Sequence, residues 1–139
     1  MIFDVKERYS GIQTVFKNCN LYGCHFLTLL SIAEESNDSP IDLIEAIRIS
    51  QSKDWINSDF ELTEKTALSL LKYFTNKNWT RREVKKLPII QDNEFTEVIY
   101  FNKRTGYHHY RRRGFDTLAN SITVQEGVIE KYYIYTRKD

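Results

Sequence analysis

The sequence predicts an α+β domain with a helical N-terminal half and an antiparallel sheet in its C-terminal half. The chain has 139 residues, which fits a single domain spanning residues 1–139. Hydrophobic residues make up 41% of it, enough to fill a core. The hydrophobic pattern changes from helical spacing to alternation after Asn76-Lys77-Asn78. Helices that precede a run of strands are typical of this fold class.

The first two helices are predicted before residue 36. Asp4 and Glu7 stand three residues apart, as in a capping box, and predict a helix over residues 4–16. The second helix is predicted over residues 24–35, directly after Gly23. Its apolar side chains cover nearly the whole circumference, so we expect a buried central helix packed on the sheet.

Two more helices are expected before the sheet. Ser39 and Pro40 combine a capping residue with a first-turn proline, and Asp42 completes an S-x-x-D pattern. The residues expected to face inward from this helix are Ile41, Ile44 and Ile47. The fourth helix is predicted to begin at Thr63, after a loop over residues 55–60. Its expected core residues are Ala67, Leu70, Leu71 and Phe74.

Alternating side chains predict five strands in the second half of the chain. They span residues 80–85, 95–102, 107–113, 121–125 and 128–136, and the last two form a hairpin that turns at Glu126-Gly127. In the final strand Tyr133 and Tyr135 point to one face, and Tyr132 and Ile134 point to the other. We expect one face to join the core and the other to be exposed as a possible interface, with the oligomeric state left open.

Charge and composition narrow the class of protein. Twenty basic and nineteen acidic residues nearly balance, so net charge does not favour nucleic acid as a partner. Residues 1–8 carry charges where a secretory signal needs an apolar stretch, and no window approaches the roughly eighteen apolar residues of a membrane span. We therefore expect a cytoplasmic protein without a membrane segment, and two free thiols at Cys19 and Cys24.

Cys24 is a candidate nucleophile because it follows Gly23 and begins the central helix. The N–H groups at a helix start stabilise a thiolate and can also hold an oxyanion. A glycine beside the thiol permits the close approach of a substrate backbone. Such a thiol is expected to react below the ordinary pKa of about 8.5. The alternative is a small core residue, the commoner role of a cysteine in an apolar helix.

Three histidines could serve Cys24 as a base. His25 is adjacent to Cys24 in the helix and is expected to point elsewhere. His108 and His109 are neighbours in a predicted strand, so one of them faces the helix and the other faces away. Asp116 follows beyond a glycine bend, where its carboxylate could fix the tautomer of the histidine.

Several short motifs surround these candidates. In chain order they are Tyr22-Gly23-Cys24-x-Phe26-Leu27-x-x-Leu30-x-Ile32-Ala33-Glu34, Thr105-Gly106-Tyr107-x-His109-Tyr110, Phe115-Asp116 and Asn120-Ser121-x-Thr123-Val124. With these motifs the chain resembles, over most of its length, the bacterial and phage-borne family called domain of unknown function 261. That family is similar to papain-like cysteine peptidases, above all to those that remove double-glycine leader peptides. The resemblance implies a papain-like fold.

The resemblance also implies roles for individual residues. Cys24 would be the nucleophile, His109 the general base and acid, and Asp116 the group that orients the imidazole. Papain-like sites place a glutamine six residues before the cysteine, and this chain has the shorter Asn18 there. The implied activity is hydrolysis of a peptide or amide bond with no cofactor and no metal. The shorter reach of Asn18 leaves an inactive, peptide-binding relative as the alternative.

Two other kinds of site fit some of these residues. Zinc could use Cys19, Cys24, His25, His108 and His109, but the cysteine spacing is wider than in common zinc knuckles and adjacent strand histidines rarely share one ion. Basic runs interleaved with tyrosines could bind phosphate and stacked bases. These runs are Arg81-Arg82, Lys85-Lys86, Lys103-Arg104 and Arg111-Arg112-Arg113. The equal number of acidic residues favours a solvated charged face instead.

Overall fold

The computed structural model describes residues 23–112 and 127–139. The helices are α2 (Cys24–Asn37), α3 (Leu43–Ser52) and α4 (Glu64–Thr75). The strands are β1 (Asn78–Val84), β2 (Glu94–Phe101), β3 (His108–Arg112) and β4 (Val128–Lys138). This arrangement confirms the predicted α+β class. The helix predicted over residues 4–16 and the strand predicted over residues 121–125 lie outside the described residues, as do Asn18, Cys19 and Asp116.

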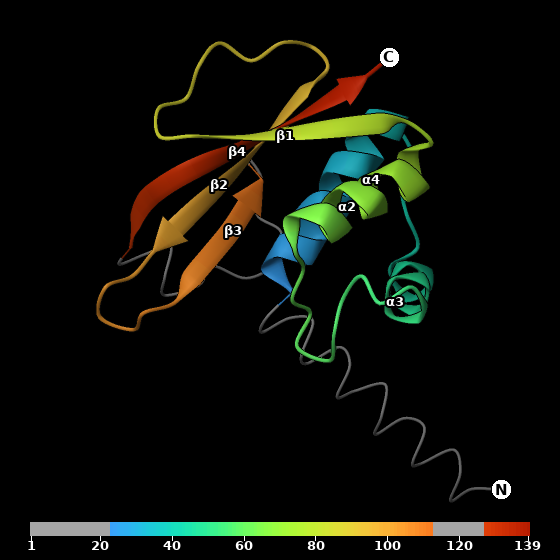
Figure 1. Ribbon diagram of the computed structural model, residues 1–139, viewed down its shortest axis with the longest axis horizontal. Coiled ribbons are helices and arrows are strands. Elements are labelled where there is room, and N and C mark those ends of the chain that lie inside the picture. Colours follow the sequence, from blue (N-terminus) through green and yellow to red (C-terminus); the bar gives the residue numbers. More distant parts are fainter. Residues whose placement is uncertain (1–22, 113–126) are drawn as a thin grey trace, which may run out of the picture.

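The four described strands form one antiparallel sheet in the order β1-β4-β2-β3. The C-terminal strand β4 is therefore central, and it joins β1 to β2. Helices α2 and α4 lie side by side against the same face of this sheet, with α2 over the β3 side and α4 over the β1 side (Figure 1). Among the described residues, no helix is long and apolar enough to cross a membrane.

Helix α2 is the buried central helix that its apolar pattern predicts. Phe26, Leu29, Ile32 and Ala33 have no exposed surface. They pack against Leu70 and Leu71 of α4, which are also fully buried, within one core. Because apolar side chains surround α2 on most sides, burial of this helix contributes much of the hydrophobic stabilisation of the domain.

The start of α3 differs from the sequence prediction. The N-cap is Asp42, whose side chain accepts a hydrogen bond from the Glu45 N–H, and not Ser39. Ile44 lies in the first turn of this helix and is 65% exposed, so it does not point inward as predicted. The buried face of α3 is formed by Ala46, Ile47, Ile49 and Ser50. Helix α4 begins as predicted, because Thr63 and Thr66 exchange hydrogen bonds in a capping box.

The final strand is buried on both of its faces only in its middle, at residues 133–135. Tyr133 and Tyr135 lie in the core on the helix side. Their face is therefore the one that joins the core, as was predicted for one of the two faces. Ile134 points to the other face and yet has no exposed surface. The expectation that the second face of this strand is an exposed interface is therefore wrong at Ile134, and Tyr132 on the same face is half-buried.

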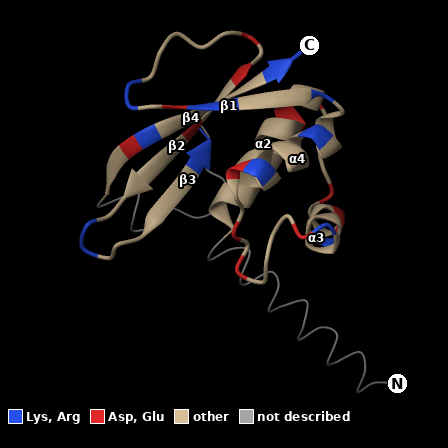
Figure 2. Cartoon of the chain, in the orientation of Figure 1, with Lys and Arg blue, Asp and Glu red and all other residues tan. Residues whose placement is uncertain are grey.

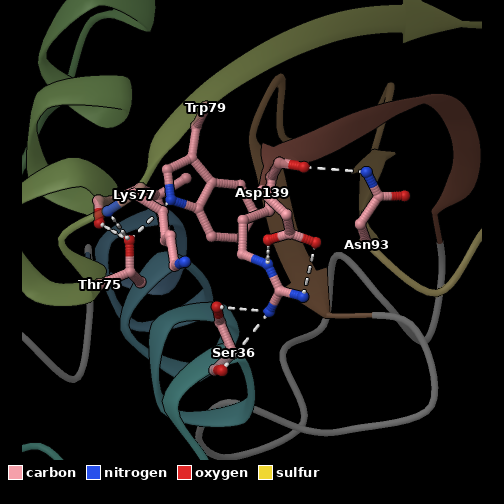
Figure 3. Close-up of polar contacts among 8 residues, drawn as sticks. Ser36, Thr75, Lys77, Trp79, Asn93 and Asp139 are labelled. Atoms are coloured by element: carbon pink, nitrogen blue, oxygen red, sulfur yellow. Dashed lines mark hydrogen bonds and ion pairs between the residues drawn. The ribbon is translucent and has the colours of Figure 1, made fainter.

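Polar contacts join the helices to the sheet where β1 and β4 lie side by side (Figure 3). The indole N–H of Trp79 donates to the Thr75 hydroxyl at the end of α4, over 2.8 Å. In the neighbouring strand, the Arg137 guanidinium donates to the Ser36 hydroxyl, 3.0 Å away in the last turn of α2. Asn93 donates to the backbone oxygen of Arg137. The C-terminal end of α2 is thus tied to β4 at the molecular surface.

Candidate active site

The candidate site begins at the N-terminal end of α2. Gly23 occupies the N-cap position and provides no side-chain cap, so the first N–H groups of the helix have no competing acceptor from that residue. The Cys24 thiol is the first side chain beyond it. Its sulfur accepts a hydrogen bond from the backbone N–H of Tyr110 in β3, with a donor–acceptor distance of 3.5 Å. The helix start and the edge strand therefore meet at this thiol.

A stripe of polar side chains places α2 on β3. Cys24, Thr28, Ser31 and Glu35 recur at helical spacing, and each contacts β3. The Thr28 hydroxyl donates to the Tyr110 carbonyl over 3.4 Å. Arg112 donates to the Ser31 hydroxyl at 3.0 Å and pairs with Glu35. These contacts with Tyr110 and Arg112 fix the position of α2 along β3.

Burial raises the pKa of the Cys24 thiol, and the nearby Glu97 carboxylate adds to that effect. The backbone N–H groups of Tyr110, His25 and Cys24 itself act in the opposite direction. Desolvation of the sulfur is the larger of these opposing effects. The low thiol pKa expected of a catalytic Cys24–His109 pair stays a prediction.

A buried polar cluster lies directly beside Cys24. Nδ1 of His25 is 2.6 Å from Oε2 of Glu97, a carboxylate on β2 with no exposed surface. The hydroxyl of Tyr135 donates to Oε1 of the same carboxylate over 3.0 Å. The His25 ring also packs against the Tyr110 ring, with centroids 4.4 Å apart. The His25 side chain is thus buried between Glu97 and Tyr110.

His109 directly precedes Tyr110 in β3, so covalent geometry limits its distance from the sulfur. The Tyr110 nitrogen is 3.5 Å from Sγ of Cys24. Because the Cα of the preceding residue is about 2.4 Å from that nitrogen, the His109 Cα lies within about 6 Å of the sulfur. Tyr110 and Arg112 both face α2, so the half-buried His109 side chain leaves the opposite face of the strand. In the described sheet β3 is an edge strand.

His108 shares the helix-facing side of β3 with Tyr110 but lies one residue further from the sulfur. Its Nε2 is 2.9 Å from Oε2 of Glu130, and its ring packs against Phe101 with centroids 4.8 Å apart. The side chain is 43% exposed. Backbone proximity favours His109 as the partner of Cys24, and the distance from the sulfur to either imidazole stays a prediction.

The structure brings together two of the four residues predicted for the site, at the level of their backbones. Cys24 and His109 meet through Tyr110, whereas Asp116 and Asn18 lie outside the described residues. Sequence reasoning missed Glu97 as a neighbour of the thiol. A signal existed, because Glu97 interrupts an otherwise apolar alternating series of Phe95, Ile99 and Phe101. A glutamate at an inward position of a strand indicates a buried polar partner.

A zinc site and a nucleic-acid-binding surface, the two other kinds of site considered, find little support in the described residues. No three His, Cys, Asp or Glu side chains between residues 23 and 112 or 127 and 139 group together to hold a metal ion. Several members of the basic runs form ion pairs, namely Arg81 with Glu64, Arg82 with Glu94 and Arg112 with Glu35. Acidic residues accordingly lie among the basic ones along the strands (Figure 2). Paired cations are less available to a phosphate backbone.

No protein-family model, curated protein or solved structure matches this chain.

Proposed function

We propose that this chain is a papain-like cysteine hydrolase, a peptidase or amidase of the kind its motifs resemble, that acts in the cytoplasm. One observation carries the proposal. The thiol at the start of the buried helix α2 accepts a hydrogen bond from the strand residue that follows His109. The backbones of a cysteine and a histidine from distant parts of the chain thereby lie close together. Nucleophilic catalysis would require the His109 imidazole to turn around the edge of β3 to the sulfur.

The proposed reaction proceeds through a thioester. His109 removes the proton from Cys24 while the sulfur attacks the carbonyl carbon of the substrate and forms a C–S bond. The imidazolium returns that proton to the leaving nitrogen as the C–N bond breaks. Water, deprotonated by His109, then attacks the thioester and releases a carboxylic acid and the free thiol. The N–H groups at the start of α2, with the Asn18 amide, would hold the oxyanion, and Asp116 would orient His109.

The neutral thiol constrains this mechanism. Since burial raises the pKa of Cys24, the thiolate forms during the attack and not in the resting protein. General-base catalysis by a histidine contributes about 10²–10⁴-fold to such a step. The histidine is then required for turnover, and its removal is more damaging than it would be for a preformed thiolate.

The test is hydrolysis of a mixture of peptides and fluorogenic peptide amides by purified protein. Cys24→Ala is expected to abolish cleavage, and His109→Ala to lower kcat/KM by about 10²–10⁴-fold. His108→Ala is the matched control, a change of the same residue type one position away, and is expected to remain within about threefold of the wild type. Equal losses from the two histidine variants would remove His109 from its role, and cleavage by Cys24→Ala would refute the proposal.

A second candidate function is peptide binding without catalysis. The raised thiol pKa and the burial that causes it favour this candidate, because an inactive relative has no need of an activated sulfur. It predicts a protein that retains a peptide from the same mixture, with equal affinity in the wild type and in Cys24→Ala. Titration calorimetry against the retained peptide distinguishes it from hydrolysis, which consumes the ligand.

A further inference from the structure

The cluster of His25, Glu97 and Tyr135 has no step in the proposed reaction, although it adjoins the thiol. Its centre is the Glu97 carboxylate, which is completely buried. Burying a carboxylate is costly unless hydrogen bonds satisfy it, and an apolar side chain in its place is often as stable or more so. A group of this kind is better explained by the geometry that it enforces than by the stability that it adds.

The three partners of the cluster come from three elements of the fold. Glu97 lies on β2, Tyr135 on the adjacent strand β4, and His25 in the first turn of α2. Burial raises the pKa of Tyr135 well above its ordinary value, so its hydroxyl keeps its proton and serves as a donor to Glu97. With one oxygen held by the sheet, the other is left to bind His25 at 2.6 Å.

We propose, building on the proposed hydrolase function, that Glu97 is a positioning residue which holds the first turn of α2 on the sheet through His25 and thereby keeps the Cys24 thiol beside β3. His25 follows Cys24 directly, so a shift of its backbone moves the sulfur by a similar distance. The contact at stake is the 3.5 Å hydrogen bond from the Tyr110 N–H to the sulfur. The other contacts of the stripe on α2, from Thr28 onward, lie further along the helix.

The consequence can be measured without a substrate, because the Tyr110 N–H reports where the thiol lies. Amide hydrogen exchange of Tyr110 is followed by NMR in the wild type, Cys24→Ala, Glu97→Gln and Glu97→Leu. Cys24→Ala removes the sulfur that accepts the Tyr110 N–H, so Tyr110 exchange is expected to become about tenfold faster or more. This increase is the reference for the other variants. Glu97→Leu is expected to accelerate Tyr110 exchange to a similar extent, because α2 loses its anchor while the apolar replacement fills the space.

Glu97→Gln is the conservative variant that separates positioning from charge. Its amide oxygen can still accept from His25, so Tyr110 exchange is expected to stay within about threefold of the wild type. Amides that hydrogen-bond within the β2–β3 ladder serve as internal controls and are expected to be unchanged in every variant. If Glu97→Leu does not fold, His25→Phe removes the same contact from the helix side, retains a ring beside Tyr110, and is expected to give the same acceleration.

Three outcomes overturn the role of Glu97. Tyr110 exchange that is unchanged in a folded Glu97→Leu protein shows that the anchor is not needed. Equal acceleration across the whole ladder shows loss of stability in place of local positioning. Acceleration in Glu97→Gln as large as in Glu97→Leu shows that charge, and not the hydrogen bond, is responsible. The hydrolase proposal is tested separately, because cleavage of peptides by Cys24→Ala would refute it. The Tyr110 exchange rates of the variants can still be compared in that case.

Discussion

The two ends of α2 are held to the sheet by different kinds of contact. At the N-terminal end, His25 binds a carboxylate that is fully buried, and the Cys24 sulfur accepts a backbone N–H. At the C-terminal end, Arg112 and Arg137 reach out from the strands to Glu35 and Ser36 near the surface. The Glu97 carboxylate is fully buried, whereas Glu35 is 48% exposed although its partner Arg112 is buried.

This difference bears on what each end can do. Surface ion pairs are weak and screened by salt, so the C-terminal end can adjust at little energetic cost. Buried hydrogen bonds to a carboxylate are strong in a low dielectric and intolerant of displacement. The end of α2 that carries the candidate nucleophile is thus the rigid one, as a catalytic thiol needs.

The largest effect on the free energy of unfolding is expected in the apolar middle of α2, which supports both ends of the helix. Leu29 has no exposed surface and lies in the core between the two ends. Leu29→Ala is expected to lower the free energy of unfolding by about 2–5 kcal/mol, from lost burial and a residual cavity. Urea unfolding followed by circular dichroism measures it. Ile44→Ala, at a site 65% exposed, is the control and should change stability by less than about 0.5 kcal/mol.

The N-terminal end is tested by removing a single donor. Tyr135→Phe leaves one Glu97 oxygen without the hydroxyl that now donates to it over 3.0 Å. The expected loss is about 1–3 kcal/mol of unfolding free energy, because a buried acceptor remains unsatisfied. Tyr107→Phe, at a position 70% exposed, provides the same chemical change without burial and should be nearly neutral. A neutral Tyr135→Phe would mean that the two ends of α2 do not differ as described.

The C-terminal end is expected to respond more weakly. Arg137→Met removes the guanidinium that donates to Ser36 and keeps most of the aliphatic packing. A loss of about 0–1 kcal/mol is expected in urea unfolding, smaller still at 1 M salt. A loss larger than that of Tyr135→Phe would reverse the ranking of the two ends.

The smallest effect concerns the pH dependence of stability. Burial raises the pKa of Cys24 in the folded state, so the folded protein holds this proton more tightly than the unfolded chain does. The resulting stabilisation is present below the unfolded thiol pKa of about 8.5 and is lost as pH rises through the folded value. Between pH 7 and pH 10 the wild type should therefore lose more stability than Cys24→Ala. Parallel losses in urea unfolding at both pH values would show an unperturbed thiol.

Local sequence patterns predicted some helix starts and core residues correctly and missed others. The apolar circumference of residues 24–35 predicted the buried helix, whose starting residue was also predicted. The capping signal at Ser39 was misleading, because Asp42 offers a competing cap three residues later and local sequence does not decide between them. The loop over residues 55–60 was predicted, but not that Ile56 and Phe60 enter the core from it.

Local patterns in the chain are enough to predict the fold class, the central helix and the position of Cys24 at its start. These features follow from periodicity and capping, which act between residues a few positions apart. Long-range contacts make β4 central, bring Glu97 to the first turn of α2 and bury the thiol. Periodicity shows which side of an element is apolar, but the distant segment that covers this side sets burial, and burial controls the thiol pKa.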